Sequence, residues 1–147
     1  MSSFLVNYTT QIGVPKTMGE ITAILASAGA TAIMQKFGPD REPSAISFRI
    51  STKYGLMSFC LPADVAGVME ILKKKKIPQK LKTKEQASRV TWRVIKAWLE
   101  AQVSLVNAGM CRIEEVFLPY AQNHEGETLV HKLRSGGFSG LALPPSR

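Results

Sequence analysis

The feature that most constrains the fold is a long helical pattern in the second half of the chain. This pattern spans residues 84–108 and ends at Gly109, because glycine readily adopts the left-handed conformation that closes many helices. Apolar side chains fill nearly all of its circumference, so the helix cannot simply lie on a surface. We therefore expect it to be the central helix of the domain, or to share part of its apolar face with another subunit. The apolar positions are Val90, Trp92, Val94, Ile95, Trp98, Leu99, Val103, Leu105 and Val106.

Strand patterns occupy much of the first half of the chain. Residues 46–51 alternate apolar and polar side chains, Lys53-Tyr54-Gly55 forms a turn, and residues 56–61 return as a second strand. Residues 30–37 are interpreted as a further strand, although their alanines would also suit an extension of the preceding helix. Residues 4–10 alternate loosely and predict a short strand at the N-terminus. The patterns together indicate a small antiparallel sheet of three to four strands.

Helix-start signals lie on both sides of these strands. Thr17 and Glu20 have the spacing of a capping box, in which a hydroxyl and a carboxylate satisfy two free backbone donors. A helix is therefore predicted over residues 17–28, ended by Gly29. Asp64 is expected to cap a second helix, which runs directly into a cluster of lysines.

Length and composition are those of one globular domain. The chain has 147 residues, of which 45% are hydrophobic and 20% charged, enough apolar material for a real core. Short helices are predicted near residues 112–121 and 127–134. We expect a single α+β domain over residues 1–134, with helices packed on one face of the sheet and the long helix at the centre. Residues 135–147 are rich in glycine and proline and predict a flexible tail.

The charge of the chain is concentrated in one short segment. Seven lysines lie between residues 73 and 84 with no acid among them, so this segment holds seven of the eight net positive charges. Pro78 interrupts helix there, which favours a mobile basic loop. Such a cluster attracts polyanions, of which nucleic acid is the commonest. A solubilising linker and a nuclear address signal are the alternative interpretations. The lysines are Lys73, Lys74, Lys75, Lys76, Lys80, Lys82 and Lys84.

A basic stripe on the long helix follows this loop. At helical spacing, Arg89, Arg93, Lys96 and Glu100 project within a sector of about 60°. The simpler interpretation is a solvated face in which Arg93 or Lys96 pairs with Glu100 or Glu85. The functional interpretation is a rigid continuation of the lysine loop, so that the two together follow consecutive phosphates.

The hairpin turn carries the exposed aromatic residue that we expect to be nearest to nucleic acid. Tyr54 follows Lys53 at the tip, and Arg49 lies nearby on the polar face of the strand, a combination suited to base stacking and phosphate contact. A turn tyrosine can also simply cover part of the core. Trp92 and Trp98 could stack on bases too, but they lie on the apolar arc and are expected in the core.

Catalytic and cofactor motifs are absent from the sequence. His124 and His131 lack the cysteine or carboxylate spacing of a zinc site, and neither a P-loop nor a dinucleotide-binding pattern occurs. No nucleophile elbow or grouped set of acids is present. We therefore expect a protein that is not an enzyme and that uses neither metal nor cofactor.

The sequence also bears on location. No apolar run is long enough for a transmembrane helix, and the first residues lack the features of a secretory signal. Cys60 and Cys111 lie far apart in apolar surroundings, which suggests two buried thiols in a reducing compartment. We expect a cytoplasmic protein that does not bind membranes.

Several short stretches resemble small uncharacterised proteins encoded by phages and prophages. They are residues 86–93 (QASRVTWR), 98–102 (WLEAQ), 115–120 (EVFLPY) and the strand end at 59–62 (FCLP), and the resemblance extends over most of residues 5–133. That group has no established activity, so the resemblance transfers no residue role. It implies a viral or mobile-element setting, in which small DNA-handling proteins are frequent. The order of elements is also similar to that of single-strand annealing folds, an analogy of fold only.

These observations lead to two hypotheses. The first is a non-catalytic, sequence-tolerant nucleic-acid-binding protein that favours single-stranded DNA, coats or anneals it, and works as a homo-oligomer. The second is a structural or protein-interaction module that oligomerises through the apolar face of the long helix.

Overall fold

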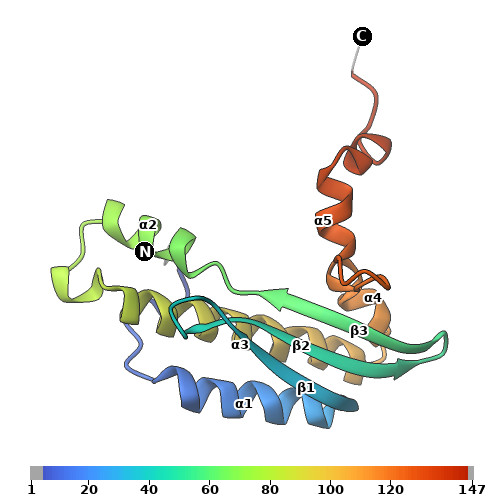
Figure 1. Ribbon diagram of the computed structural model, residues 1–147, viewed down its shortest axis with the longest axis horizontal. Helices are drawn as coiled ribbons and strands as arrows, with labels where there is room; N and C mark the ends of the chain where they lie inside the picture. The colour runs from blue at the N-terminus through green and yellow to red at the C-terminus, as the bar shows by residue number, and fades with distance from the viewer. Residues whose placement is uncertain (1–4, 146–147) are drawn as a thin grey trace.

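The computed structural model describes residues 5–145 and has an α+β architecture. A three-stranded antiparallel sheet lies against two long helices, and the C-terminal segment rises away from them (Figure 1). The elements are α1 (Val14–Ser27), β1 (Ala30–Phe37), β2 (Pro43–Thr52), β3 (Gly55–Pro62), α2 (Val65–Lys74), α3 (Lys84–Asn107), α4 (Ile113–Val116) and α5 (Leu129–Arg134), with short 3₁₀ helices η1 (Gln79–Leu81), η2 (Leu118–Tyr120) and η3 (Gly137–Gly140).

The N-terminal segment differs from the sequence prediction. Residues 5–9 form turns and a bend, so the strand predicted over residues 4–10 is wrong where the structure describes it; residue 4 lies outside the described residues. Asn7 adopts a positive φ of 62°, which breaks an extended path. α1 begins at Val14, with Gly13 as N-cap and Pro15 in the first turn, where its fixed φ suits a helix start.

The capping box predicted at Thr17 and Glu20 is therefore also wrong. Both residues lie inside α1, and Thr17 is fully buried. The Thr17 hydroxyl donates back to the carbonyl of Gly13 at 3.5 Å instead of capping the helix. The predicted end of the helix is confirmed, because Gly29 has a φ of 103° and β1 starts immediately after it.

The strands pair in the order β1-β2-β3, which confirms the predicted hairpin and the strand over residues 30–37. One row across the sheet joins Ile33, Phe48 and Phe59, all of which contribute to the hydrophobic core. At the turn between β2 and β3, Gly55 has a φ of 112°, a conformation that few other residues adopt. The alternation of apolar and polar residues thus sets which face of the sheet is buried.

The core lies between this face of the sheet and the pair α1 and α3. Ile46 and Phe48 of β2 pack in one cluster with Ile21 and Leu25 of α1 and with Trp92 of α3. Figure 1 shows both helices side by side beneath the sheet. The predicted packing of helices on one face is therefore present.

The central position predicted for the long helix is confirmed. α3 contacts α1 and α2, and its Val90, Trp92 and Leu99 side chains are fully buried inside the chain. The Thr83 hydroxyl caps its first turn by accepting a hydrogen bond from the backbone N–H of Gln86 at 3.1 Å. Most of the apolar arc is thus buried or half-buried within the chain, and Leu105 is the exposed member of the arc.

The C-terminal segment is fastened to the sheet by aromatic rings. Phe117, just after α4, is fully buried and lies 5.2 Å from the ring centre of Phe48, 5.8 Å from that of Phe59 and 5.7 Å from that of Trp98. The backbone N–H of Gln122 also donates to the Ser58 carbonyl at 2.9 Å, which attaches this segment to the edge of β3. Beyond this anchor, α5 contacts η2 and η3 and points away from the core.

Candidate nucleic-acid interface

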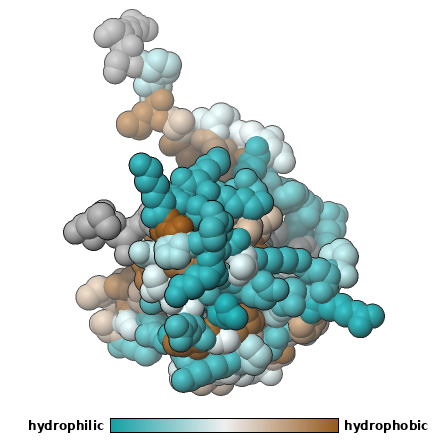
Figure 2. Space-filling view, turned by 90° about the vertical axis from the view of Figure 1, so that its left-hand side faces the viewer, coloured by the Kyte–Doolittle hydropathy of each residue, from teal (hydrophilic) through white to brown (hydrophobic). Residues whose placement is uncertain are grey.

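The lysine cluster lies at one end of the molecule, between α2 and α3. Lys73 and Lys74 form the last turn of α2, Lys80 belongs to η1, and Lys84 begins α3. Figure 2 views the molecule from this end and shows mostly hydrophilic side chains around a smaller apolar area. Of the seven lysines, all are exposed except Lys82, which is half-buried.

Several of these lysines contact other residues of the chain. Lys73 lies 3.4 Å from a carboxylate oxygen of Glu70, and the Lys82 ammonium donates to the Lys73 carbonyl at 3.3 Å. Lys84 forms an ion pair with Asp40, which raises the pKa of the Lys84 ammonium and lowers that of the Asp40 carboxyl. Among residues 5–145 the structure gives no acidic partner to Lys74, Lys76 or Lys80, which therefore hold the most available charge.

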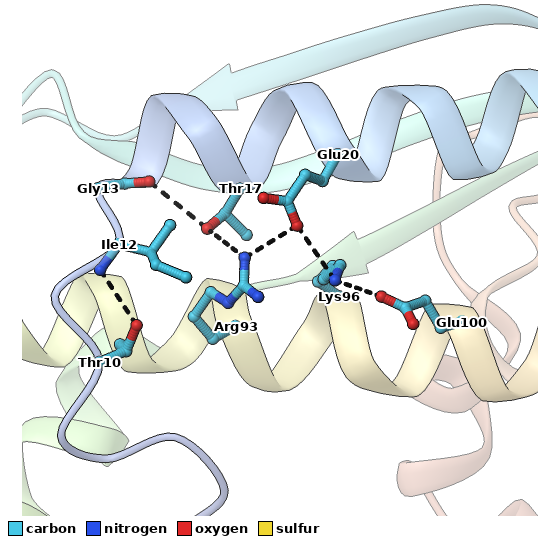
Figure 3. Close-up of polar contacts among 8 residues, drawn as sticks. All are labelled: Thr10, Ile12, Gly13, Thr17, Glu20, Arg93, Lys96 and Glu100. Atoms are coloured by element: carbon cyan, nitrogen blue, oxygen red, sulfur yellow. Dashed lines mark hydrogen bonds and ion pairs between the residues drawn. The ribbon is translucent and has the colours of Figure 1, made fainter.

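The basic stripe of α3 is used differently from the sequence prediction. Arg93 lies 3.0 Å and Lys96 lies 3.1 Å from the same carboxylate oxygen of Glu20 on α1 (Figure 3). Lys96 also pairs with Glu100, as the simpler interpretation of the stripe predicted. The side chains of Arg93 and Lys96 are only 13% and 20% exposed. Glu20 thus clamps α1 to α3, and these two cations are not presented as a continuation of the lysine cluster.

The charges in this clamp stabilise one another. Hydrogen bonds from Lys96 and Arg93 lower the pKa of the Glu20 carboxyl, so the carboxyl stays ionised at pH values below its ordinary pKa. Hydrogen bonds to Glu100 and Glu20 raise the pKa of the Lys96 ammonium. Arg93 Nη1 also reaches the buried Thr17 hydroxyl at 3.4 Å, which explains the polar residue at this helix contact.

Arg89, the third member of the stripe, is held by a residue that the sequence did not single out. Gln86 is 4% exposed, and its side-chain nitrogen donates to the carbonyls of Tyr8 and Thr10 at 3.0 and 2.9 Å. Its side-chain oxygen accepts from Arg89 Nη1 at 3.0 Å. Gln86 thus fastens the N-terminal segment to α3 and orients the Arg89 guanidinium. A glutamine next to an apolar run gives no sequence signal for such a long-range role.

The hairpin residues lie at the other end of the sheet from the lysines (Figure 1). Tyr54 is 72% exposed, and the Lys53 ammonium lies 4.8 Å from the centre of its ring. Arg49 is exposed on the face of the sheet opposite the core, where its Nε donates to the Ser58 hydroxyl at 3.2 Å. Only Lys53 and Tyr54 are in contact with each other, and the fold does not bring these three residues to the lysine end.

Other functional signals can be assessed across residues 5–145. No group of three or more histidine, cysteine or acidic side chains there is arranged to hold a metal ion. No helix in that range is both long and apolar enough to cross a membrane. Cys60 and Cys111 are free thiols, but each is half-buried, not buried as predicted.

Comparison with known proteins identified no match for this chain among protein-family models, curated proteins or solved structures.

Proposed function

We propose that this protein binds nucleic acid without sequence preference, through the lysine cluster at the junction of α2 and α3. The observation that carries the proposal is the distribution of charge. The cations on α3 are held by carboxylates or by Gln86, whereas Lys74, Lys76 and Lys80 are exposed and have no acidic partner among the described residues. A concentrated, unneutralised group of ammonium ions favours a polyanion.

The chemistry of lysine explains why such binding would tolerate any sequence. An ammonium group contacts phosphate as a point charge, and phosphate contacts position a strand without reading its bases. We infer single-stranded DNA as the preferred partner, as the sequence suggests; the exposed Tyr54 ring would stack on a base only if the strand extended from the lysine end along the sheet. Coating or annealing of strands, in the cytoplasmic and phage-related setting that the sequence suggests, is the role we infer. No step in that role requires catalysis.

A charge-matched pair of variants tests the proposal. In the first, Lys74, Lys76 and Lys80 are replaced by glutamine; in the control, Arg112, Lys132 and Arg134, which are also exposed, are replaced in the same way. Each single-strand phosphate contact contributes about 0.7 to the slope of log K against log salt, so loss of three contacts flattens the slope by about 2. The control should change it little, because its cations lie outside the lysine end.

The assay is fluorescence anisotropy with labelled single-stranded DNA, duplex DNA and RNA across a salt series. At low salt the lysine variant should bind single strands at least about tenfold more weakly than the control variant. Equal losses in both variants would mean that only total charge matters. Absence of binding to any of the three nucleic acids at low salt would refute the proposal.

A protein-interaction role is the second candidate, and one observation favours it. Met34 and Leu56 lie on the face of the sheet opposite the core and are 56% and 59% exposed. That face is a second surface, besides the apolar face of the long helix, that another subunit would cover. Sedimentation of the free protein together with the binding assay distinguishes the roles: a stable oligomer with no affinity for nucleic acid would favour this candidate.

A further inference from the structure

A groove of about 540 Å³ lies between α1 and β1. Its α1 wall is formed by residues 14, 15, 18, 19 and 22, which recur at the i+4 spacing of one helix face. Its β1 wall includes Gln35 and the exposed ring of Phe37. Among residues 5–145, the lining contains one charged side chain, that of Glu42. We call this feature the α1–β1 groove; its mostly apolar lining suits apolar side chains of a partner.

Gly19 lies in the middle of the α1 wall. Glycine in the interior of a helix is less stable than alanine, so a glycine there needs a reason. Its backbone is ordinary α-helix, and a Cβ atom added to it would meet no atom within 4 Å apart from the adjoining helix. Neither a special conformation nor packing within the described chain therefore accounts for it. Close approach of another backbone to the groove does, because glycine has no side chain to prevent it.

The outer edge of β1 runs beside the groove. β1 pairs with β2 on one side, and across residues 5–145 no backbone hydrogen bond joins its other side to a further segment. Lys36 is the one charged residue of the strand, so little charge protects this edge. A free edge of this kind is a template for an added strand. Alternate side chains of that added strand would point into the α1–β1 groove.

The same chain contains a segment with the matching pattern. Leu141 and Leu143, in the C-terminal tail after η3, are 71% and 91% exposed. Being two residues apart, they lie on one side of the chain when it is extended. Pro144 has no backbone N–H and would end an added strand after Leu143. Residues 135–147 include no acid, so Glu42 of the groove would not repel them.

The position of the tail favours docking between two copies of the chain. α5 contacts η2 and η3 and rises on one side of the sheet, whereas α1 lies along the other side (Figure 1). We propose that the C-terminal tail of one copy docks in the α1–β1 groove of a second copy. Leu141 and Leu143 then fill the groove, and the tail extends the sheet as a short strand beside β1.

This contact joins two different surfaces, so it is heterologous. Each copy still has a free tail or a free groove after one contact forms, and repetition produces a ring or an open chain of copies. The assembly does not rest on the proposed nucleic-acid binding. Combined with that binding, an open chain of copies would coat a strand cooperatively.

The test measures self-association by sedimentation velocity across a concentration series. Gly19→Leu fills the groove, and Leu141→Ser with Leu143→Ser removes the apolar side chains of the tail. The matched controls are Ser27→Leu, at an exposed position of α1 outside the groove, and Met110→Ser, at an exposed apolar position outside the tail. Each blocked variant should self-associate at least about a hundredfold more weakly than wild type, because two leucine side chains lose their burial. The controls should match wild type.

Gly19→Leu should fold as well as wild type, since its side chain enters open space and leucine favours helix. A mixture of the two blocked variants is the decisive measurement. Gly19→Leu keeps an intact tail and the tail variant keeps an intact groove, so together they should form a heterodimer that grows no further. Failure of the mixture to associate overturns the proposal, as does self-association retained by either blocked variant.

A wild type that is monomeric throughout the series also overturns the proposal, including the case in which the tail covers its own groove. Binding of a single-stranded oligonucleotide only long enough for one copy tests the lysine cluster separately. Its affinity should be equal in wild type and in both blocked variants. Absence of that binding refutes the nucleic-acid proposal and leaves the assembly proposal standing, whereas binding by a strictly monomeric wild type has the opposite meaning.

Discussion

Replacement of Phe117 by alanine tests the assignment of the domain core most directly. Phe117 is fully buried and contacts the rings of Phe48, Phe59 and Trp98, so truncating its side chain removes only buried contacts. Truncation of a buried phenylalanine to alanine costs about 3–5 kcal/mol, because apolar contact is lost and a cavity remains. At about 2–4 °C per kcal/mol for a domain near this size, Tm should fall by roughly 10 °C.

Urea unfolding followed by tryptophan fluorescence measures this loss, because Trp98 lies in the same ring cluster. The matched control is Phe138→Ala, since Phe138 is 46% exposed in the C-terminal segment and its loss should change stability by less than about 0.5 kcal/mol. A Phe117→Ala loss below about 1 kcal/mol would refute the ring cluster as the anchor that joins α4 to the sheet. Equal losses in both variants would do the same.

Two further predictions concern the Glu20 clamp. The lowered pKa of Glu20 means that its ion pairs stabilise the fold above the ordinary carboxyl pKa and that this contribution disappears as pH falls through the lowered value. The difference in Tm between wild type and Glu20→Gln should therefore be largest near neutral pH and shrink below about pH 4, as scanning calorimetry would show; a constant difference would contradict the clamp. Arg93→Gln with Lys96→Gln should lower Tm by several degrees but leave the affinity for single-stranded DNA unchanged, because both side chains face Glu20. A marked loss of affinity in the folded double variant would show that Arg93 and Lys96 contact the nucleic acid, which would contradict this prediction.

The elements that the sequence predicted well are those with local signals. The alternation of Ile46, Phe48 and Ile50, the glycine of the hairpin turn and the end of α3 before Gly109 all follow from residues adjacent in the chain. The start of α1 was misjudged because Thr17 and Glu20 match a cap, whereas Gly13 and Pro15 give the true start. Local spacing alone does not decide between two such competing signals.

The roles of charged residues were harder to predict, since they depend on partners far away in the sequence. The partner of Arg93 is Glu20 on another helix, and the carbonyls that hold Gln86 belong to Tyr8 and Thr10. Helical periodicity correctly placed Arg93 and Lys96 on one stripe, but it contains no information about which surface covers that stripe.

The arrangement of charge connects these findings to binding. Because Glu20 and Glu100 pair with Arg93 and Lys96, the densest group of unpaired positive charge lies where α2 joins α3. An approaching polyanion is therefore attracted toward that end of the molecule. The ion pairs that hold α1 against α3 therefore also determine where the unpaired positive charge of the molecule lies.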